Sequence, residues 1–385
     1  MKKLLSIILG IILALLIAVG CIWGKEIGSV TSIKSVEDNP YLYTMDYKAS
    51  YDLDDLLSHD IDGNAKLGQY VANRIGKGLF HITIKSNQLA DENGEYHGFG
   101  CTSFQALKAD ATGYWYGRNY DYFKNPTLVV TSHPKKGYAS ISCCDMSHFG
   151  FGLDKLPTRL TDKFMCLAAI YTPLDGVNEK GLCMSIMALP KQAARQETGK
   201  HKAATSVLIR LVLDRCATVE EAVELIRSVD VRHDTVTGGG YHYMVADAQG
   251  HAAVVEFDLE DGWKTLVVPK DTALQYMTVT NHLLSPKFQT EEPNPKYGNP
   301  YSRSWWRYDT VEEYLSQRNG TLTLQQAQEC LGLVHWVDLA WGDPKGTIED
   351  TQYSNVYDQT NHILYLRNWN NYDHTYQFQL LTSEK

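Results

Sequence analysis

Hydrophobic and polar positions alternate with the period of a β-strand through much of the chain after residue 100. The predicted strands cover 102–107, 114–122, 127–133, 138–143, 163–171, 182–189, 241–246, 251–257, 263–268, 275–280, 351–358 and 362–368. A helical period predicts one helix over 205–216 and three more that begin at capping signals on Thr218, Thr310 and Thr323. Blocks of strands separated by pairs of helices, without strict β-α alternation, predict an α+β fold.

The beginning of the chain has a different pattern. Lys2 and Lys3 precede an uncharged run over 4–24, which is typical of a signal peptide, or of a membrane anchor if the run stays uncut. Cys21 ends a short sequence similar to a lipoprotein processing site, so cleavage, anchoring and lipidation all remain open. In each case the positive flank predicts that the rest of the chain is exported.

Two short helices are predicted next, over 52–57 and 65–75. The acidic run 60–64 between them hints at a calcium loop. Ala65 stands where that loop requires glycine, and Val71 stands where it requires the closing glutamate. We therefore predict a turn at this position.

Composition narrows the class of protein. Of the 385 residues, 44% are hydrophobic and 21% are charged, as in a globular protein. The net charge of −9 disfavours a nucleic-acid partner, because a phosphate backbone would be repelled. Eight cysteines occur without a Cys-x-x-Cys pair, which gives no support to a zinc ribbon, and they leave disulfide pairing open. The 24 tyrosines and eight tryptophans fit a β-rich core with amphipathic pockets.

Candidate chemistry lies at Cys101, which follows Gly98-Phe99-Gly100 at the abrupt start of a predicted strand. The glycine before it has no side chain to block attack by the thiol on its own upstream carbonyl. If that bond breaks, Cys101 becomes N-terminal, and its α-amine, with an unperturbed pKa of about 8, can act as the base. No Gly-x-Ser-x-Gly elbow or His-Glu-x-x-His motif offers another mechanism. His282, beside an apolar strand, is more typical of a structural or pocket histidine than of a base.

Five segments, in the same order, resemble the N-terminal-nucleophile linear amide hydrolases, which include bile-salt hydrolases, penicillin V acylases and acid ceramidase. These segments are 101–103 with 117–122, then 176–182, 280–281, 304–308 and 351–358. The resemblance runs from Cys101 to about Asn371. It implies a four-layer αββα sandwich of two antiparallel sheets, and it implies no metal or organic cofactor.

The resemblance also implies roles for single residues. Cys101 would be the nucleophile and, through its amine, the base. Arg118 would favour the thiolate, and Asp121 would orient the α-amine. Asn281 would donate to the developing oxyanion, and Arg307 would support the site by its charge. If the residues have no catalytic role, Arg118 is a surface arginine of a strand, Asp121 is a turn aspartate and Asn281 caps the end of a strand.

Four features depart from the family pattern or leave it open. Arg303 is close enough in sequence to exchange with Arg307 in an alignment. The spacing from Cys101 to Arg118 is one residue longer than in the family. Ala188 stands where bile-salt hydrolases have an asparagine, so bile-salt specificity is not implied. The long segment before the cysteine is similar to that of the ceramidase-like branch, which is cut internally into two chains.

We therefore predict a hydrolase that cleaves a linear, non-peptide amide of an N-acyl compound with an apolar acyl group. Autocatalytic cleavage between Gly100 and Cys101 would activate it. The predicted domains are a signal peptide or membrane anchor (1–24), a pro-segment (25–100) and a catalytic domain (101–385). We expect the protein outside the cytoplasm, secreted or membrane-anchored, with a small-molecule N-acyl amide as its partner; a homo-oligomer stays open.

Three alternatives remain open at this point. The first is an acyltransferase that uses the same acyl-cysteine intermediate. The second is an inactive, membrane-tethered binding module on the same scaffold. The third is a secreted, disulfide-rich binding protein.

Overall fold

The computed structural model describes residues 2–36, 38–79, 100–190, 193–233, 239–298, 303–340 and 348–381. Two large sheets form its centre. The nine-stranded sheet has the order β1 (Lys34–Val36), β2 (Asn39–Tyr47), β5 (Thr127–Ser132), β6 (Ser140–Asp145), β7 (Asp175–Asn178), β8 (Cys183–Pro190), β11 (Gly239–Ala246), β12 (Ala252–Asp258) and β13 (Lys264–Pro269). The eight-stranded sheet has the order β14 (Tyr276–Val279), β3 (Gly100–Lys108), β4 (Tyr114–Tyr122), β17 (Ile348–Asp358), β18 (Ile363–Asn368) and β19 (Asn371–Gln379), with β15 (Thr321–Leu322) on β3 and β16 (Leu339–Ala340) on β17.

Helices surround the two sheets, and one small parallel pair of strands lies beside them. The α-helices are α1 (Lys2–Ser32), α2 (Leu53–Ser58), α3 (Asn64–Gly76), α4 (Leu160–Lys163), α5 (Thr205–Arg215), α6 (Val219–Arg227), α7 (Ser304–Ser316) and α8 (Leu324–Leu333). The 3₁₀ helices are η1 (Met146–Phe149), η2 (Phe164–Tyr171) and η3 (Pro286–Phe288), and the small pair is β9 (Lys202–Ala204) with β10 (Asp230–Arg232).

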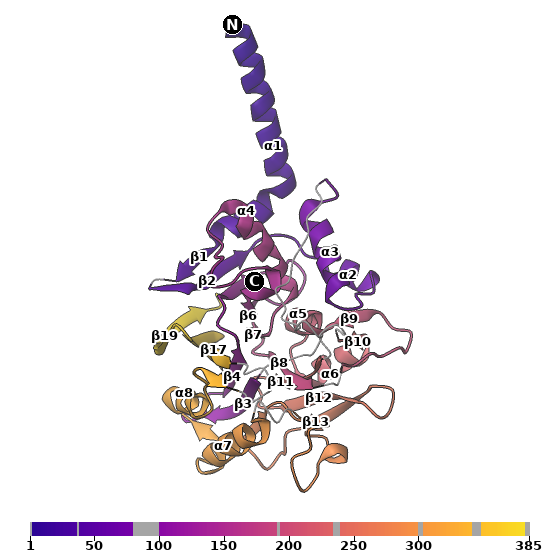
Figure 1. Cartoon of the computed structure of the whole chain (residues 1–385), viewed down its shortest axis with the longest axis vertical. Helices are drawn as coiled ribbons and strands as arrows, with labels where there is room; N and C mark the ends of the chain where they lie inside the picture. Colours follow the sequence, from indigo (N-terminus) through magenta and orange to yellow (C-terminus); the bar gives the residue numbers. More distant parts are fainter. Residues whose placement is uncertain are drawn as a thin grey trace.

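The sheets lie face to face between two layers of helix (Figure 1). Helices α5 and α6 pack on the nine-stranded sheet, and α7 and α8 pack on the eight-stranded sheet. Strands β3 and β8 contact each other between the sheets. The predicted α+β class and the four-layer αββα arrangement are confirmed.

Polar side chains cross the space between the sheets. Ser103 Oγ lies 2.9 Å from Ser185 Oγ, and the Tyr353 hydroxyl donates to Asp175 at 2.6 Å. Part of the outer face of the eight-stranded sheet is apolar instead, and Phe104 there belongs to a buried cluster with residues of α7 and α8. A functional group placed between the sheets therefore meets hydrogen-bonding neighbours in a buried setting.

The predicted elements agree with most of the observed ones, with two clear errors. The strand predicted over 163–171 is wrong: residues 164–171 form the 3₁₀ helix η2, and the strand next to it is β7. That run is almost entirely apolar, and periodicity alone does not separate a buried strand from a buried helix in such a run. The helix start predicted at Thr310 is also wrong, because α7 begins at Ser304 and the Thr310 hydroxyl donates to the carbonyl of Trp306 at 2.8 Å.

The part of the chain before Cys101 is built into the fold. Strand β2 pairs in parallel with β5, with Leu42 opposite Thr127 and Tyr47 opposite Ser132. Helix α1 extends away from the body of the molecule (Figure 1). Among the residues whose side chains the structure describes, no helix has the length and apolar character needed to cross a bilayer. The predicted export segment and the predicted domain boundaries stay predictions.

Candidate active site

Strands β3 and β4 form the hairpin that carries the candidate nucleophile. In its register Cys101 lies opposite Tyr120, and Gly100 lies opposite Asp121. Because side chains alternate along a strand, the Cys101 thiol and the Arg118 guanidinium both point between the sheets. Asp121 points to the other face, toward α7. All of these side chains are buried, and Cys101 is only 1% exposed.

Asn281 and Arg307 hold the backbone of Cys101. The N–H of Cys101 donates to Asn281 Oδ1 at 2.7 Å, and its carbonyl accepts a hydrogen bond from Arg307 Nη1. Arg307 also donates to Asn281 Oδ1 at 2.5 Å and to the Thr102 hydroxyl at 2.8 Å. Since two donors converge on Oδ1, the NH₂ group of Asn281 faces away and donates one hydrogen to the carbonyl of Ala188 at 2.8 Å.

Two neighbouring elements bring these residues to the end of β3. Asn281 follows β14, and Arg307 lies in the first turn of α7. Ser304 connects the two elements, because its Oγ accepts from the N–H of Asn281 at 2.8 Å and lies 3.0 Å from the Thr280 hydroxyl. Arg303 precedes α7 and is exposed. The structure therefore places Arg307, and not Arg303, against Cys101.

His282 has structural contacts at the same strand end. Its ring stacks on Trp305 with centroids 5.1 Å apart, and its Nδ1 lies 2.9 Å from Ser304 Oγ. Burial, assisted by the nearby His242 and Arg307, lowers the pKa of His282 to about 3. The imidazole is therefore neutral at physiological pH and packs the segment that carries Asn281.

Arg118 lies beside the thiol without a well-aligned hydrogen bond to any described residue. Its Nε lies 3.7 Å from Oδ2 of Asp175, which belongs to the opposite sheet. Asp175 is itself held by the hydroxyl of Tyr353 at 2.6 Å. Burial raises the pKa of Cys101, and the charges of Arg118 and Arg307 act in the opposite direction, toward the thiolate. Asp175 thus fixes the guanidinium whose charge opposes the rise in the pKa of Cys101.

Asp121 is a buried carboxyl group with only one of its two oxygens hydrogen-bonded among the described residues. Its Oδ1 accepts from the Thr351 hydroxyl at 2.6 Å, and its Oδ2 has no hydrogen-bond partner among the described residues. Burial raises the pKa of Asp121 from 3.8 to about 6, although the charges of Arg307 and Arg118 oppose this rise. Asp121 can therefore change protonation state near neutral pH and can accept another donor at Oδ2.

Gly100 occupies a position that a larger residue does not fit. A Cβ atom at Gly100 would lie 2.4 Å from the ring of Trp336 and 2.9 Å from the Cβ of Asp121. The Trp336 ring also lies 5.2 Å from the Cζ of Arg307. Glycine before Cys101 is therefore required by packing.

A cavity of about 100 Å³ opens at the Cys101 thiol. Besides Cys101, Arg118 and Tyr120, its apolar lining is Leu67, Gly68, Val71, Ala168, Leu174, Ile186 and Ala188. Its polar lining is Asn64, His148, Thr172, Thr205, Ser206 and Tyr241. The cavity combines a mostly hydrophobic wall with a few polar groups and the Cys101 thiol, as in sites for small amphipathic ligands.

One group among the described residues has metal-ligating side chains close together, formed by Glu220, Asp247 and His251. The buried carboxylate of Asp247 already accepts from the backbone N–H groups of Val219 at 3.2 Å and Gln249 at 3.0 Å. None of these residues lines the cavity at Cys101.

All five residues proposed from the sequence meet around one strand end: Cys101, Arg118, Asp121, Asn281 and Arg307. The structure adds Thr102, Asp175 and Trp336, which sequence reasoning did not single out. Asp175 had a usable signal, since it is an acid at the edge of a run of apolar and small residues. Trp336 had none, because its contact with Gly100 depends on how α8 is followed by β16.

The site lies where the two sheets and α7 meet. The sequence profile of the acyl-coenzyme A:6-aminopenicillanic acid acyl-transferase family matches residues 161–367. This range is more than half of the chain, and the chain belongs to this family. The matched range contains Asn281 and Arg307 and begins after Cys101.

Other comparisons give more distant similarities. No curated protein matches the chain by sequence. Among solved structures, a variant of conjugated bile acid hydrolase from Clostridium perfringens is 17% identical, with a TM-score of 0.49 over 73% of this chain and 92% of that chain. Penicillin V acylase from Agrobacterium tumefaciens is 16% identical, with a TM-score of 0.46 over 73% of this chain and 86% of that chain.

Family membership places the chain among N-terminal-nucleophile enzymes that hydrolyse acyl amides or transfer their acyl groups.

Proposed function

We propose that this protein is an amidase that cuts itself between Gly100 and Cys101 and then uses Cys101 to hydrolyse a linear, non-peptide N-acyl amide. The observation that carries the proposal is that both polar groups of the Cys101 backbone are hydrogen-bonded. Its N–H donates to Asn281 and its carbonyl accepts from Arg307, while its thiol lines a cavity. These two hydrogen bonds would keep Cys101 in place after the Gly100–Cys101 bond is broken.

In the proposed maturation the Cys101 sulfur attacks the carbonyl carbon of Gly100. The Gly100–Cys101 C–N bond breaks, a thioester forms, and the Cys101 nitrogen takes a proton to become an amine. Water then hydrolyses the thioester, which releases the Gly100 carboxylate and the free thiol. The thiol proton is the one that the Cys101 nitrogen takes up. Asp121, which lies opposite Gly100 and whose Oδ2 has no hydrogen-bond partner among the described residues, would orient the new α-amine.

In the proposed turnover the free α-amine of Cys101 takes the thiol proton, the sulfur attacks the carbonyl carbon of the substrate amide, and the amide C–N bond then breaks. The α-amine of Cys101, held by Asn281 Oδ1, carries the proton to the leaving amine. The second NH₂ hydrogen of Asn281 is available to the oxyanion, the kind of contact worth about 3 kcal/mol in other enzymes. Water then hydrolyses the acyl-thioester and releases the acid.

The cavity supports an apolar acyl group. Leu67, Val71, Leu174 and Ile186 give a hydrophobic wall to the cavity that Cys101 also lines. A charged acyl group would lose its hydration there with few polar partners. We therefore propose a substrate with an uncharged, hydrocarbon-rich acyl part.

Intact mass and N-terminal sequencing of the purified protein test the maturation. A wild-type chain that begins at Cys101 supports it, and an uncut chain with full amidase activity overturns it. A panel of conjugated bile acids, N-acylethanolamides, N-acyl amino acids and phenoxyacetyl amides tests the substrate class. Cleavage of none of them by correctly processed protein would contradict the amidase assignment.

An acyltransferase is the second candidate, because the family to which the chain belongs is described as an acyl-transferase family. In that reaction an amine replaces water at the acyl-thioester. Product analysis with added amine acceptors separates the two functions, since only a transferase converts the acyl-enzyme preferentially to a new amide. An inactive binding module would show no covalent labelling of Cys101 by an electrophilic acyl probe.

We also propose that the N-terminal segment exports the protein and that the catalytic part works outside the cytoplasm, attached to the membrane or secreted. The charged start Lys2-Lys3 followed by the uncharged run over 4–24 supports this. Fractionation of cells that produce the full chain would test it, and recovery only in the cytoplasm would contradict it.

A further inference from the structure

Helix α3 forms one wall of the cavity at Cys101, although it belongs to the segment before the proposed cut. Asn64, Leu67, Gly68 and Val71 line the cavity from this helix. Leu67 and Val71 are one turn apart, so both face the same way, and they are 4% and 1% exposed. The part of the chain that precedes Cys101 therefore shapes the space where the acyl group would bind.

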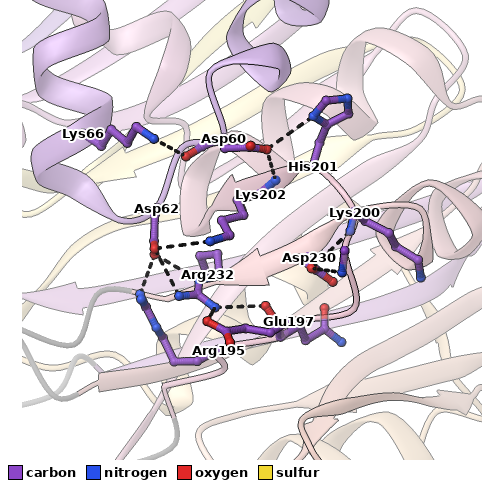
Figure 2. Close-up of polar contacts among 12 residues, drawn as sticks. Asp60, Asp62, Lys66, Arg195, Glu197, Lys200, His201, Lys202, Asp230 and Arg232 are labelled. Atoms are coloured by element: carbon purple, nitrogen blue, oxygen red, sulfur yellow. Dashed lines mark hydrogen bonds and ion pairs between the residues drawn. The ribbon is translucent and has the colours of Figure 1, made fainter.

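Asp62 attaches the start of α3 to the catalytic part of the chain (Figure 2). Its two carboxylate oxygens accept from Arg232 Nε at 2.9 Å and Nη2 at 3.1 Å, a fork-to-fork contact. Arg195 Nη1 lies 2.8 Å from the same carboxylate, and Lys202 Nζ lies 3.9 Å from it. The side chain of Arg232 is only 4% exposed, so this contact is better shielded from water than an ordinary surface ion pair.

The surroundings of Asp62 are themselves fixed. Asp60 accepts from the backbone N–H of Lys202 at 3.1 Å, and its own carbonyl accepts from Lys66 at 2.9 Å. Asp230 accepts from the backbone N–H groups of Gly199 at 3.1 Å and Lys200 at 3.3 Å (Figure 2). The loop that receives Asp62 is thus held by hydrogen bonds of its own, and α3 begins against it.

We propose that α3 sets the size of the acyl group accepted by the cavity and that Asp62 is the positioning residue that holds α3 there. The proposal rests on the proposed function for the identity of the ligand. It also requires that the segment before Cys101 stays bound after the cut. The pairing of β2 with β5 and the Asp62 contacts cross the cut without depending on the Gly100–Cys101 bond.

Gly68 offers a direct test, because it lies on the cavity wall and a Cβ atom there meets no atom within 4 Å. Gly68→Leu adds a side chain to the cavity while it improves the helix propensity of α3. Gly332→Leu in α8 is the matched control: its position is also helical, also open within 4 Å, and does not line the cavity.

Two readouts keep this test separate from the proposed function. The first is hydrolysis of N-acylethanolamides from acetyl to hexadecanoyl. The second is calorimetric binding of the corresponding fatty acids to a Cys101→Ala chain, which needs no catalysis. We expect Gly68→Leu to shift the preference toward short acyl groups by about tenfold or more in both readouts, and Gly332→Leu to leave it unchanged.

The outcomes are distinct. Hydrolysis with an unchanged chain-length preference in Gly68→Leu would overturn the role of α3 and leave the amidase standing. A shifted binding preference in a protein that hydrolyses nothing would support the role of α3 and overturn the amidase. Absence of both hydrolysis and fatty-acid binding in the protein with Gly68 unchanged would overturn the amidase and the role of α3 together.

The positioning role of Asp62 is tested by Asp62→Asn, with Asp62→Glu as the conservative variant. We expect Asp62→Asn to raise KM for the preferred substrate about tenfold at similar kcat, and Asp62→Glu to recover most of this loss. Asp54→Asn is the control, since Asp54 lies on α2 in the same segment and makes an exposed ion pair with Arg215 at 2.7 Å. Equal kinetics of Asp62→Asn and Asp54→Asn would overturn the role of Asp62.

Discussion

The two sheets contribute differently to the site. The eight-stranded sheet and its helices supply the groups that hold Cys101 by hydrogen bonds, chiefly Asn281 and Arg307. The nine-stranded sheet supplies apolar side chains such as Ile186, and α3, on the same side, completes the wall. Asp175 is the exception, because it reaches from the nine-stranded sheet to the guanidinium of Arg118.

This difference separates reactivity from selectivity in space. A substitution on the eight-stranded side should lower the rate for every substrate, since it disturbs the groups around the sulfur. A substitution on the nine-stranded side should change which acyl group is preferred and leave the reaction itself intact. The predictions below test this separation. A substitution on the eight-stranded side that changes the acyl preference, or one on the nine-stranded side that lowers the rate for every substrate, would show that reactivity and selectivity are coupled.

The largest effect is expected from Cys101→Ala. The chain should stay uncut, and kcat/KM should fall by about 10⁴-fold or more, because both the nucleophile and the proposed base are lost. Mass spectrometry and amide hydrolysis measure the two consequences. Cys330→Ala is the matched control. It removes one buried sulfur from α8, on the same side of the molecule, and should leave processing normal. Residual activity near the wild-type level in Cys101→Ala would contradict the mechanism.

Asn281→Ala should have the next largest effect. Its Oδ1 accepts from the nitrogen of Cys101, and in the proposed reaction its NH₂ group would donate one hydrogen to the oxyanion. We expect kcat to fall by about 10²- to 10³-fold for all substrates, with little change in their relative preference. Steady-state kinetics on two substrates of different acyl length measures this. Asn361→Ala, at an exposed turn, should be silent, and a selective loss for one acyl length would count against the separation of the sheets.

Asp121→Asn should change stability in the opposite direction to activity. Burial raises the pKa of Asp121 from 3.8 to about 6, so the folded chain binds this proton more tightly than the unfolded chain. The free energy of unfolding therefore falls as the pH rises from about 4 to about 6, by an amount on the order of 3 kcal/mol for this group. Asp121→Asn should remove that part of the pH dependence.

The measurement is thermal unfolding from pH 4 to pH 7 of two uncut proteins, Cys101→Ala and Cys101→Ala with Asp121→Asn. We expect the second protein to lose less stability as the pH rises and to be the more stable one at pH 7. In the Cys101 background, Asp121→Asn should slow self-cleavage. Parallel stability curves for the two proteins would contradict this prediction. They would show that charging the Asp121 carboxyl does not lower the free energy of unfolding.

The strand and helix patterns were predictable because each element buries one side. Strand β4 was predicted with the observed bounds, and the capping box of Thr323 with Gln326 is complete in the structure. Strand β2 was missed, because Asn39 and Pro40 at its start break the β pattern and its pairing with β5 is parallel and distant in sequence. Parallel partners leave no turn signal that sequence reasoning could use.

The candidate site was predictable only where a motif marked it. Cys101, Arg118 and Asn281 came from short segments with a family pattern, and the structure places them together. The wall formed by Leu67 and Val71 was not predictable, because their helical spacing is equally typical of a core helix. Its relation to Cys101 depends on Asp62 and Arg232, which are 170 residues apart in the chain.

The smallest effect is expected from Ile186→Val, which removes one methylene from the cavity wall on the nine-stranded sheet. The preference should move toward a larger acyl group by about tenfold, the lower end of the roughly 10- to 200-fold range that one methylene in a hydrophobic pocket gives. Ile141→Val is the matched control, because Ile141 is buried in β6 of the same sheet and does not line the cavity. Both variants should lose about 1 kcal/mol of stability from the missing packing. Only Ile186→Val should alter the ratio of kcat/KM values, and an equal shift in both variants would mean that selectivity follows stability instead of cavity shape.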